Sequence, residues 1–117
     1  MTGLTTHVLD LTHGIPAVNV VIQLLWLGDT GNSLIKTVKT NGDGRLDEPL
    51  LSAEEMKNGE YELLFFIGDY FRGKELSLPE PAFLDKVSIR FGIAETNAHY
   101  HVPLLVSPWG YQVYRGS

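Results

Sequence analysis

Four histidines and a short polar ending are the residues of this sequence best suited to acid–base chemistry. The histidines are His7, His13, His99 and His101, and the chain closes with the segment Tyr114–Ser117. An imidazole with an ordinary pKa of about 6.5 can accept or donate a proton near neutral pH. The sequence contains no cysteine, which excludes thiolate nucleophiles, disulfides and Cys-ligated zinc. Nucleophilic chemistry therefore has to use other groups.

Strand alternation predicts where two of these histidines point. Side chains alternate between the two faces of a β-strand, so His7 shares a face with Thr5, and His101 shares one with His99. The opposite face carries a set that we expect to form the core: Leu4, Thr6, Val8, Tyr100, Val102, Leu104 and Val106. His7 and His101 would then point outward. From spacing alone, the plainer interpretation is an ordinary surface histidine that bonds a carbonyl group.

Two metal sites can be weighed against the sequence. His99 and His101 have the spacing of a zinc half-site on one strand face, but no third ligand lies close by in the sequence. The segment "KTNGDGRLDEPL" partly resembles a calcium loop, yet Lys39 and Leu50 occupy the first and twelfth positions, where carboxylates are needed. We therefore expect no metal site.

The same "TNGDGR" segment has the composition of a tight turn. Asn-Gly and Asp-Gly pairs favour the backbone conformations of short turns between strands. We therefore expect residues 40–45 to join two strands and to deliver Arg45 in the first residues of the second one.

The apolar pattern predicts an all-β fold. Period-two runs, typical of strands buried on one face, occur at residues 4–11, 20–27, 33–40, 61–67, 87–93, 99–107 and 111–115. Seven short strands with tight turns favour an antiparallel sandwich. Helical signals are confined to a capping box from Ser52 to Glu55, with Gly59 as the stop, and to a short turn within "GDYFRGKEL" at residues 68–76.

Length and composition fit one folded domain over residues 1–117, with 44% hydrophobic and 20% charged residues. The net charge is −5 and the nine Lys and Arg residues are scattered, so we expect no nucleic-acid partner. The longest apolar stretches fall far short of the roughly 18 residues that indicate a membrane span, and we expect no membrane partner. The N-terminus lacks the basic and apolar regions of a signal peptide, so we expect a cytoplasmic protein.

Several motifs together resemble the 5-hydroxyisourate hydrolases of the transthyretin-like family. They are "HVLD" at residues 7–10, "GIPAVNV" at 14–20, "TNGDGR" at 40–45 and "HYHVPLLVSPWGYQVYRGS" at 99–117. The resemblance covers essentially the whole chain. It implies a transthyretin-like antiparallel β-sandwich of seven to eight strands with one short helix. It also implies a homotetramer, built as a dimer of dimers, with active sites in a channel between subunits.

The resemblance implies a reaction and a set of site residues. The reaction is the cofactor-independent hydrolysis of 5-hydroxyisourate to 2-oxo-4-hydroxy-4-carboxy-5-ureidoimidazoline in urate degradation, with no metal. By position in the motifs, the catalytic residues would be His7, Arg45, His101 and Ser117, and the substrate-binding residues Tyr114, Arg115 and Gly116. His13 and His99 are outside this set.

The residue types suit such a hydrolysis. His101 and His7 would share the activation of water and the protonation of the departing nitrogen, and their individual roles stay open. Arg45 would stabilise negative charge and keep one imidazole neutral by charge repulsion. Gly116 would permit a backbone turn that brings Ser117 into the site. The alternative function is a small-ligand carrier on the same scaffold, without catalysis. Turnover of the substrate would distinguish the enzyme from the carrier.

Overall fold

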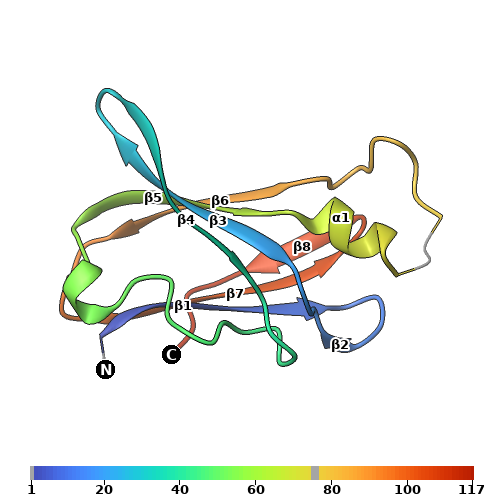
Figure 1. The fold of residues 1–117 in the computed structure, drawn as a ribbon, viewed down its shortest axis with the longest axis horizontal. Coiled ribbons are helices and arrows are strands. Elements are labelled where there is room, and N and C mark those ends of the chain that lie inside the picture. The colour runs from blue at the N-terminus through green and yellow to red at the C-terminus, as the bar shows by residue number, and fades with distance from the viewer. Residues whose placement is uncertain (1, 75–76) are drawn as a thin grey trace.

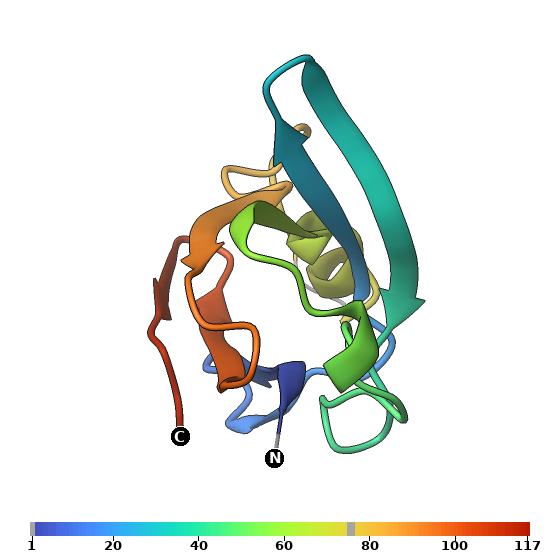
Figure 2. The same ribbon diagram turned by 90° about the vertical axis from the view of Figure 1, so that its left-hand side faces the viewer.

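The computed structural model describes residues 2–74 and 77–117, and these form two four-stranded sheets packed face to face (Figures 1 and 2). The first sheet has the strand order β2-β1-β7-β8, and the second has the order β4-β3-β5-β6. The strands are β1 Gly3–Asp10, β2 Ile15–Pro16, β3 Val21–Gly28, β4 Gly31–Lys39, β5 Gly59–Phe65, β6 Val87–Ile93, β7 His99–Ser107 and β8 Gly110–Val113. The predicted all-β sandwich is confirmed.

One strand pair differs from the antiparallel sandwich that the sequence predicts. Strands β1 and β7 pair in parallel, from Gly3 opposite His99 to Asp10 opposite Val106. A parallel pair needs a long connection, and here most of the chain, including the whole second sheet, lies between the two strands. The other pairs are antiparallel. The parallel register places Thr5 directly opposite His101.

The core lies between the sheets and follows the predicted alternation. Leu4 and Val8 of β1 and Leu104 of β7 are fully buried, and they pack with residues of the second sheet such as Ile22 and Leu63. Thr5 and His7 on the opposite face of β1 are only partly buried. The first sheet therefore has an outer face on which polar side chains can form a site.

Helical structure is limited to two short segments. A 3₁₀ helix, η1, spans Ala53–Glu55, and the Ser52 amide donates to the Glu55 carboxylate at 2.8 Å. It ends before Met56, so Gly59 is not its stop but the first residue of β5. Helix α1 spans Ile67–Arg72, within the predicted segment 68–76 apart from its first residue. The last two positions of that segment lie outside the described residues.

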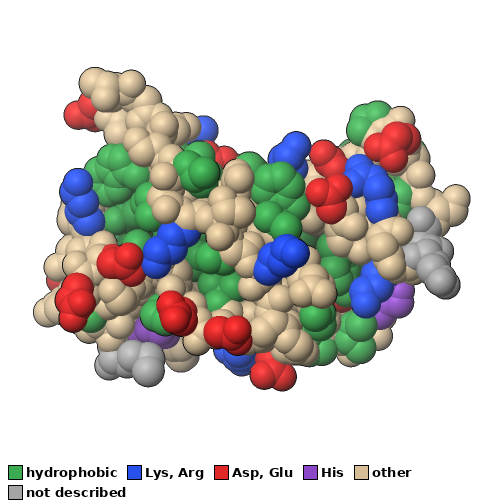
Figure 3. Space-filling model, in the orientation of Figure 1, with side chains coloured by type: hydrophobic (Ala, Val, Ile, Leu, Met, Phe, Trp, Pro, Cys, Tyr) green, Lys and Arg blue, Asp and Glu red, His purple; other side chains and the backbone are tan. Residues whose placement is uncertain are grey.

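Charges of both signs are interspersed on the surface. Figure 3 shows Lys and Arg side chains next to Asp and Glu side chains over one face, without a continuous basic area. Within residues 2–74 and 77–117, no helix is long and apolar enough to cross a bilayer.

Candidate active site

A cavity of about 430 Å³ lies on the outer face of the first sheet. It is lined by the start of β1, by His99 and His101 of β7, by loop residues 45–49 and by Ser117. In Figure 2, the C-terminal tail lies on one side of the β1 and β7 pair, and the loop after β4 lies on the other side. A cavity of this size is suited to a small-molecule ligand.

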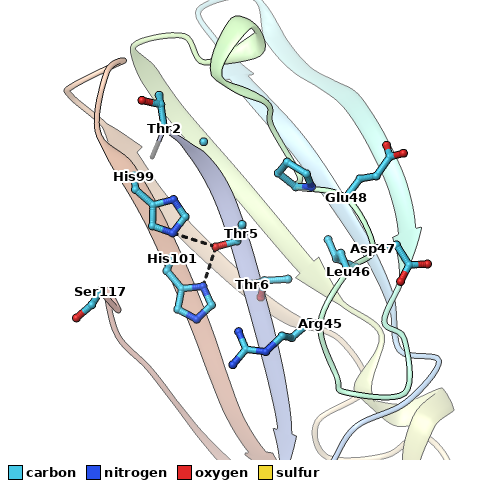
Figure 4. Close-up of a pocket in the computed structure, with 12 residues that line it drawn as sticks. Thr2, Thr5, Thr6, Arg45, Leu46, Asp47, Glu48, His99, His101 and Ser117 are labelled. Carbon is cyan, nitrogen blue, oxygen red and sulfur yellow. Dashed lines mark hydrogen bonds between the residues drawn. The ribbon is translucent and has the colours of Figure 1, made fainter.

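His101 lies in this cavity, on the outward face that alternation predicts. Nδ1 of its ring is 2.8 Å from the Thr5 hydroxyl, which holds the imidazole in place (Figure 4). Burial, followed by the positive charge of Arg45, lowers the pKa of His101 below its usual value. The ring is therefore largely neutral at pH 7 and able to accept a proton.

Arg45 reaches His101 from a loop rather than from a strand. Residues 40–50 form a turn-rich loop between β4 and η1, so the prediction that this segment joins two strands, with Arg45 in the second, is wrong. The Asn41 carboxamide oxygen accepts the amides of Asp43 and Arg45 at 2.9 and 3.1 Å, which closes the loop on itself instead of starting a strand. The Arg45 side chain then extends toward His101 (Figure 4).

Gly44 fixes this loop against β1. The Val8 amide donates to the Gly44 carbonyl at 2.8 Å, and Gly44 has a φ of 72°. A Cβ atom there would lie 2.4 Å from the Val8 carbonyl oxygen, so only glycine fits without a shift. These contacts hold the neighbouring residue, Arg45, in a fixed position beside β1.

His7 lies on the same face of β1, two residues beyond Thr5. Its Nε2 is 2.9 Å from the Asp43 carbonyl oxygen. A carbonyl oxygen only accepts, so Nε2 carries the hydrogen and Nδ1 of the neutral ring is free to accept a proton. Burial and then the charge of Arg45 lower the pKa of His7, against an opposing effect of Asp43. The charge of Arg45 thus acts on both imidazoles, although His7, unlike His101, does not line the cavity.

The C-terminal tail approaches the same site. The Gly116 amide donates to the His101 carbonyl at 2.7 Å, and Ser117 lines the cavity. A Cβ on Gly116 would lie 2.7 Å from Cδ2 of His101. The structure gives Gly116 no positive φ, so its requirement here is close approach to the imidazole rather than the special turn that the sequence suggested.

Tyr114 and Arg115 lie elsewhere in the single chain. Both line a second cavity of about 450 Å³ beside β6. The Arg115 guanidinium lies 4.1 Å from the centroid of the Tyr100 ring and donates to the His99 carbonyl at 3.3 Å. These contacts attach the tail to β7 just before Ser117 enters the first cavity.

The sequence motifs leave His99 outside the catalytic set and give Thr5 no role, yet both residues line the cavity. The period-two pattern places His99 on the face of His101, and this was the signal available for it. The contact of both rings with Thr5 depends on the β1–β7 register, which the pattern does not encode. His13, in contrast, bonds Asp10 at 2.6 Å in the turn between β1 and β2 and does not line this cavity.

The arrangement supplies proton acceptors beside a fixed positive charge. A neutral imidazole can remove a proton from water, the imidazolium so formed can pass that proton to a departing group, and a guanidinium can hold a developing oxyanion. Within the described part of the chain, no group of three His, Cys, Asp or Glu residues is arranged to hold a metal ion. The two imidazoles and the guanidinium are suited to acid–base hydrolysis of a small molecule.

Comparison with known proteins places this chain in a family. The model of the HIUase/Transthyretin family matches residues 4–116. The 5-hydroxyisourate hydrolase of Ralstonia nicotianae is 55% identical over 100% of both chains, and that of Mesorhizobium japonicum is 58% identical over 97% of this chain and 91% of its own. Transthyretin from Sparus aurata superposes with a TM-score of 0.87 over 99% of this chain and 97% of its own, and at 22% identity it shows the fold alone. The chain belongs to the HIUase/Transthyretin family.

Proposed function

We propose that this protein hydrolyses 5-hydroxyisourate to 2-oxo-4-hydroxy-4-carboxy-5-ureidoimidazoline. The observation that carries this proposal is the presence of Arg45 and His101 at one small cavity, with His7 on the same face of β1 and bonded to the Arg45 loop. The full-length relatives of this chain are named 5-hydroxyisourate hydrolases. The substrate is a small heterocycle whose ring contains an amide-like bond. Its hydrolysis requires removal of a proton from water, stabilisation of an oxyanion and protonation of the departing nitrogen.

We assign the proton transfers to the two imidazoles. His101 and His7 both have a lowered pKa, so each is available as a neutral base near pH 7. The tetrahedral intermediate places negative charge on the former carbonyl oxygen, and the planar donor fork of Arg45 can hold it. Which imidazole removes the water proton and which one protonates nitrogen is left open.

We assign the C-terminal residues to binding and positioning. Ser117 lines the cavity, and Gly116 allows the tail to lie against His101. Tyr114 and Arg115 would contribute to substrate binding from the tail, as the family motif suggests. In the single chain these two side chains lie at the second cavity, so this role requires the assembled protein.

We also propose that the protein works as a homotetramer, a dimer of dimers. Large apolar side chains remain exposed on the single chain, among them Phe83, Trp109 and Tyr114, at 69%, 61% and 53%. Burying such a surface against other copies would be favourable. The edge strands β6 and β8, which flank the second cavity, have no partner on one side within the described sheets.

The cytoplasmic location expected from the sequence stays a prediction, and cell fractionation would test it.

Product analysis tests the proposed function. Freshly made 5-hydroxyisourate is mixed with the protein in a thousandfold molar excess of substrate. The product is followed by ¹³C NMR and compared with the product of spontaneous decay. We expect rapid and complete conversion to the ring-opened ureidoimidazoline. A carrier would instead bind the compound in fixed stoichiometry and leave the decay rate of the excess unchanged.

A further inference from the structure

The hydroxyl of Thr5 is shared by two imidazoles on the outer face of the first sheet. Its Oγ1 lies 2.8 Å from Nδ1 of His101 and 3.4 Å from Nε2 of His99 (Figure 4). The two rings are nearly parallel, with an interplanar angle of 10° and centroids 6.4 Å apart. The longer contact is at the limit for a hydrogen bond, and such contacts often tighten when substrate binds. Thr5 thus connects two rings that do not bond each other.

This geometry links the positions of the protons on the two rings. A hydroxyl has one hydrogen to donate, so Thr5 cannot donate to both imidazoles at once. If Thr5 donates to His99, it must accept the Nδ1 hydrogen of His101, and Nε2 of His101 is then free to act as a base. If Thr5 donates to His101, the hydrogen of the neutral His101 ring is on Nε2. While Thr5 donates to one of the two rings, the ring nitrogen of His101 that carries the hydrogen therefore depends on the tautomer of His99.

His99 is not an ordinary surface histidine. Its Nδ1 is buried and has no hydrogen-bond partner among the described residues. Buried polar atoms are normally paired, and an unpaired one needs an explanation other than packing. The other ring nitrogen faces the hydroxyl that holds His101.

We propose that Thr5 and His99 form a proton relay behind His101, an inference that rests on the proposed hydrolase function. When Nε2 of His101 takes a proton from the attacking water, the Nδ1 proton of His101 passes to Thr5 Oγ1. The hydroxyl proton of Thr5 passes at the same time to Nε2 of His99. His101 is then neutral with its hydrogen on Nε2, and His99 holds the positive charge. With His101 as the base, the reverse movement passes the water proton on from Nε2 of His101 to the departing nitrogen, directly or by way of His7, so no proton is gained or lost overall.

The relay moves positive charge away from Arg45. The groups that face His101 are His7 on β1, Arg45 on the loop, His99 on β7 and the C-terminal residue Ser117 on the tail. Figure 4 shows the Arg45 guanidinium directed toward His101, with His99 farther along β7. A charge on His101 would be repelled by this guanidinium, and repulsion falls with distance. Thr5 and His99 are positioning residues in this scheme, since they act on the substrate only through His101.

Substitution of Thr5 tests the relay. Thr5→Val keeps the shape of the side chain and removes the hydroxyl, whereas Thr5→Ser keeps the hydroxyl. We expect Thr5→Val to lower kcat by about 10- to 100-fold with little change in KM, and Thr5→Ser to recover most of the loss. Thr37→Val on β4 makes the same chemical change at an exposed position of the other sheet and should behave as wild type.

The solvent isotope effect separates a relay from simple positioning. In mixtures of H₂O and D₂O, a curved dependence of kcat on the deuterium fraction indicates that more than one proton moves in the step. We expect a curve for wild type and Thr5→Ser and a straight line for Thr5→Val. A Thr5→Val variant with wild-type kcat, or with a reduced kcat and the same curve as wild type, would overturn the relay.

His99 provides a second variant that does not alter β1. His99→Phe keeps a flat ring without nitrogen, and it should lose about as much kcat as Thr5→Val. The kcat of the double variant should fall no further than that of either single variant, because all three variants interrupt the same proton relay. Full activity in His99→Phe, or fully additive losses, would overturn the proposal even if Thr5→Val failed to fold.

A measurement without substrate keeps this proposal separate from the proposed function. In ¹⁵N NMR titrations of the histidine rings, protonation of one of His99 and His101 should shift the ring nitrogens of the other in wild type and Thr5→Ser, but not in Thr5→Val. Independent titrations in wild type would overturn the relay. A wild-type protein that does not accelerate the decay of 5-hydroxyisourate would instead overturn the hydrolase function.

Discussion

At the scale of residues, the site depends on keeping imidazoles neutral beside a cation. Burial and the charge of Arg45 both lower the pKa of His101 and of His7. A neutral imidazole next to a guanidinium can accept a proton from water, while the guanidinium stays available for the oxyanion. The same positive charge therefore serves two purposes in the proposed mechanism.

Substitution of Arg45 should change the pH profile as well as the rate. Arg45→Met removes the repulsion that favours the neutral rings, so the pKa of both histidines rises. The acid limb of kcat/KM should then move to higher pH, and kcat should fall by about 10²- to 10³-fold. Arg45→Lys keeps the charge and should leave the limb in place. An unmoved limb, or one at lower pH, in Arg45→Met would contradict this electrostatic role.

The sequence predicts some of these residues better than others. The outward direction of His7 and His101 follows from strand alternation and is confirmed. The contact between Thr5 and His101 could not be predicted, because it depends on the parallel pairing of strands that are far apart in the chain. Arg45 was predicted on a strand, since the "NGDG" composition does not reveal that Asn41 closes the loop on itself. The catalytic and binding roles themselves stay predictions.

At the scale of elements, three segments bring the site together: the β1–β7 pair, the loop after β4 and the C-terminal tail. The parallel register aligns Thr5 with His101, the loop places Arg45 above them, and the tail adds Ser117. The strand pattern predicts the sheets, but it misses the two-residue β2 and extends the last strand to Arg115, whereas β8 ends at Val113. The residues beyond Val113 are thereby free to turn toward the cavity.

Gly116→Ala tests the position of the tail. The added Cβ would lie 2.7 Å from the His101 ring, so the tail must shift and carry Ser117 with it. We expect kcat/KM to fall by about 10- to 100-fold, because small displacements of catalytic groups have large effects on rate. Gly110→Ala, at the turn between β7 and β8, meets no atom within 4 Å and is the matched control. Equal activity of the two variants would show that Ser117 need not be held there.

At the scale of the whole molecule, the polar cluster of Asp10, His13 and Tyr70 joins the first sheet to helix α1. Asp10 is buried and accepts hydrogen bonds from the His13 ring at 2.6 Å and from the Tyr70 hydroxyl at 2.8 Å. Burial alone would raise the pKa of Asp10, but the hydrogen bonds from Tyr70 and His13 outweigh it and lower the pKa. The carboxylate is therefore stabilising in its charged form.

The single domain over residues 1–117 stays a prediction, supported by one core shared between both sheets.

Asp10→Asn should destabilise the protein in a pH-dependent way. With a lowered pKa in the folded state, the stabilisation by Asp10 is present above its unfolded pKa and is lost as the pH falls through the folded value. We expect a loss of about 1–3 kcal/mol in the free energy of unfolding at pH 7, which shrinks below about pH 4. Urea unfolding at one protein concentration measures it. Exposed Asp29→Asn is the control, and equal stabilities of the two variants at pH 7 would contradict the role of Asp10.

The proposed tetramer predicts a surface that depends on exposed aromatic rings. Phe83 and Trp109 lie with ring centroids 5.9 Å apart and are largely exposed. We expect light scattering to give the mass of four chains for wild type, and Trp109→Asp to reduce it, since burying a charge in an apolar contact is unfavourable. Leu34→Asp changes another exposed apolar residue, on the β3–β4 hairpin, and should stay tetrameric. A monomeric wild-type protein would contradict the assembly.

The most direct test of the proposed function is the ultraviolet absorbance of fresh 5-hydroxyisourate, followed with catalytic amounts of wild type and of His101→Asn against spontaneous decay. The account predicts accelerated decay with wild type and near-complete loss of the acceleration in a folded His101→Asn variant. Decay equal to the blank with wild-type protein, or full acceleration by His101→Asn, would contradict it.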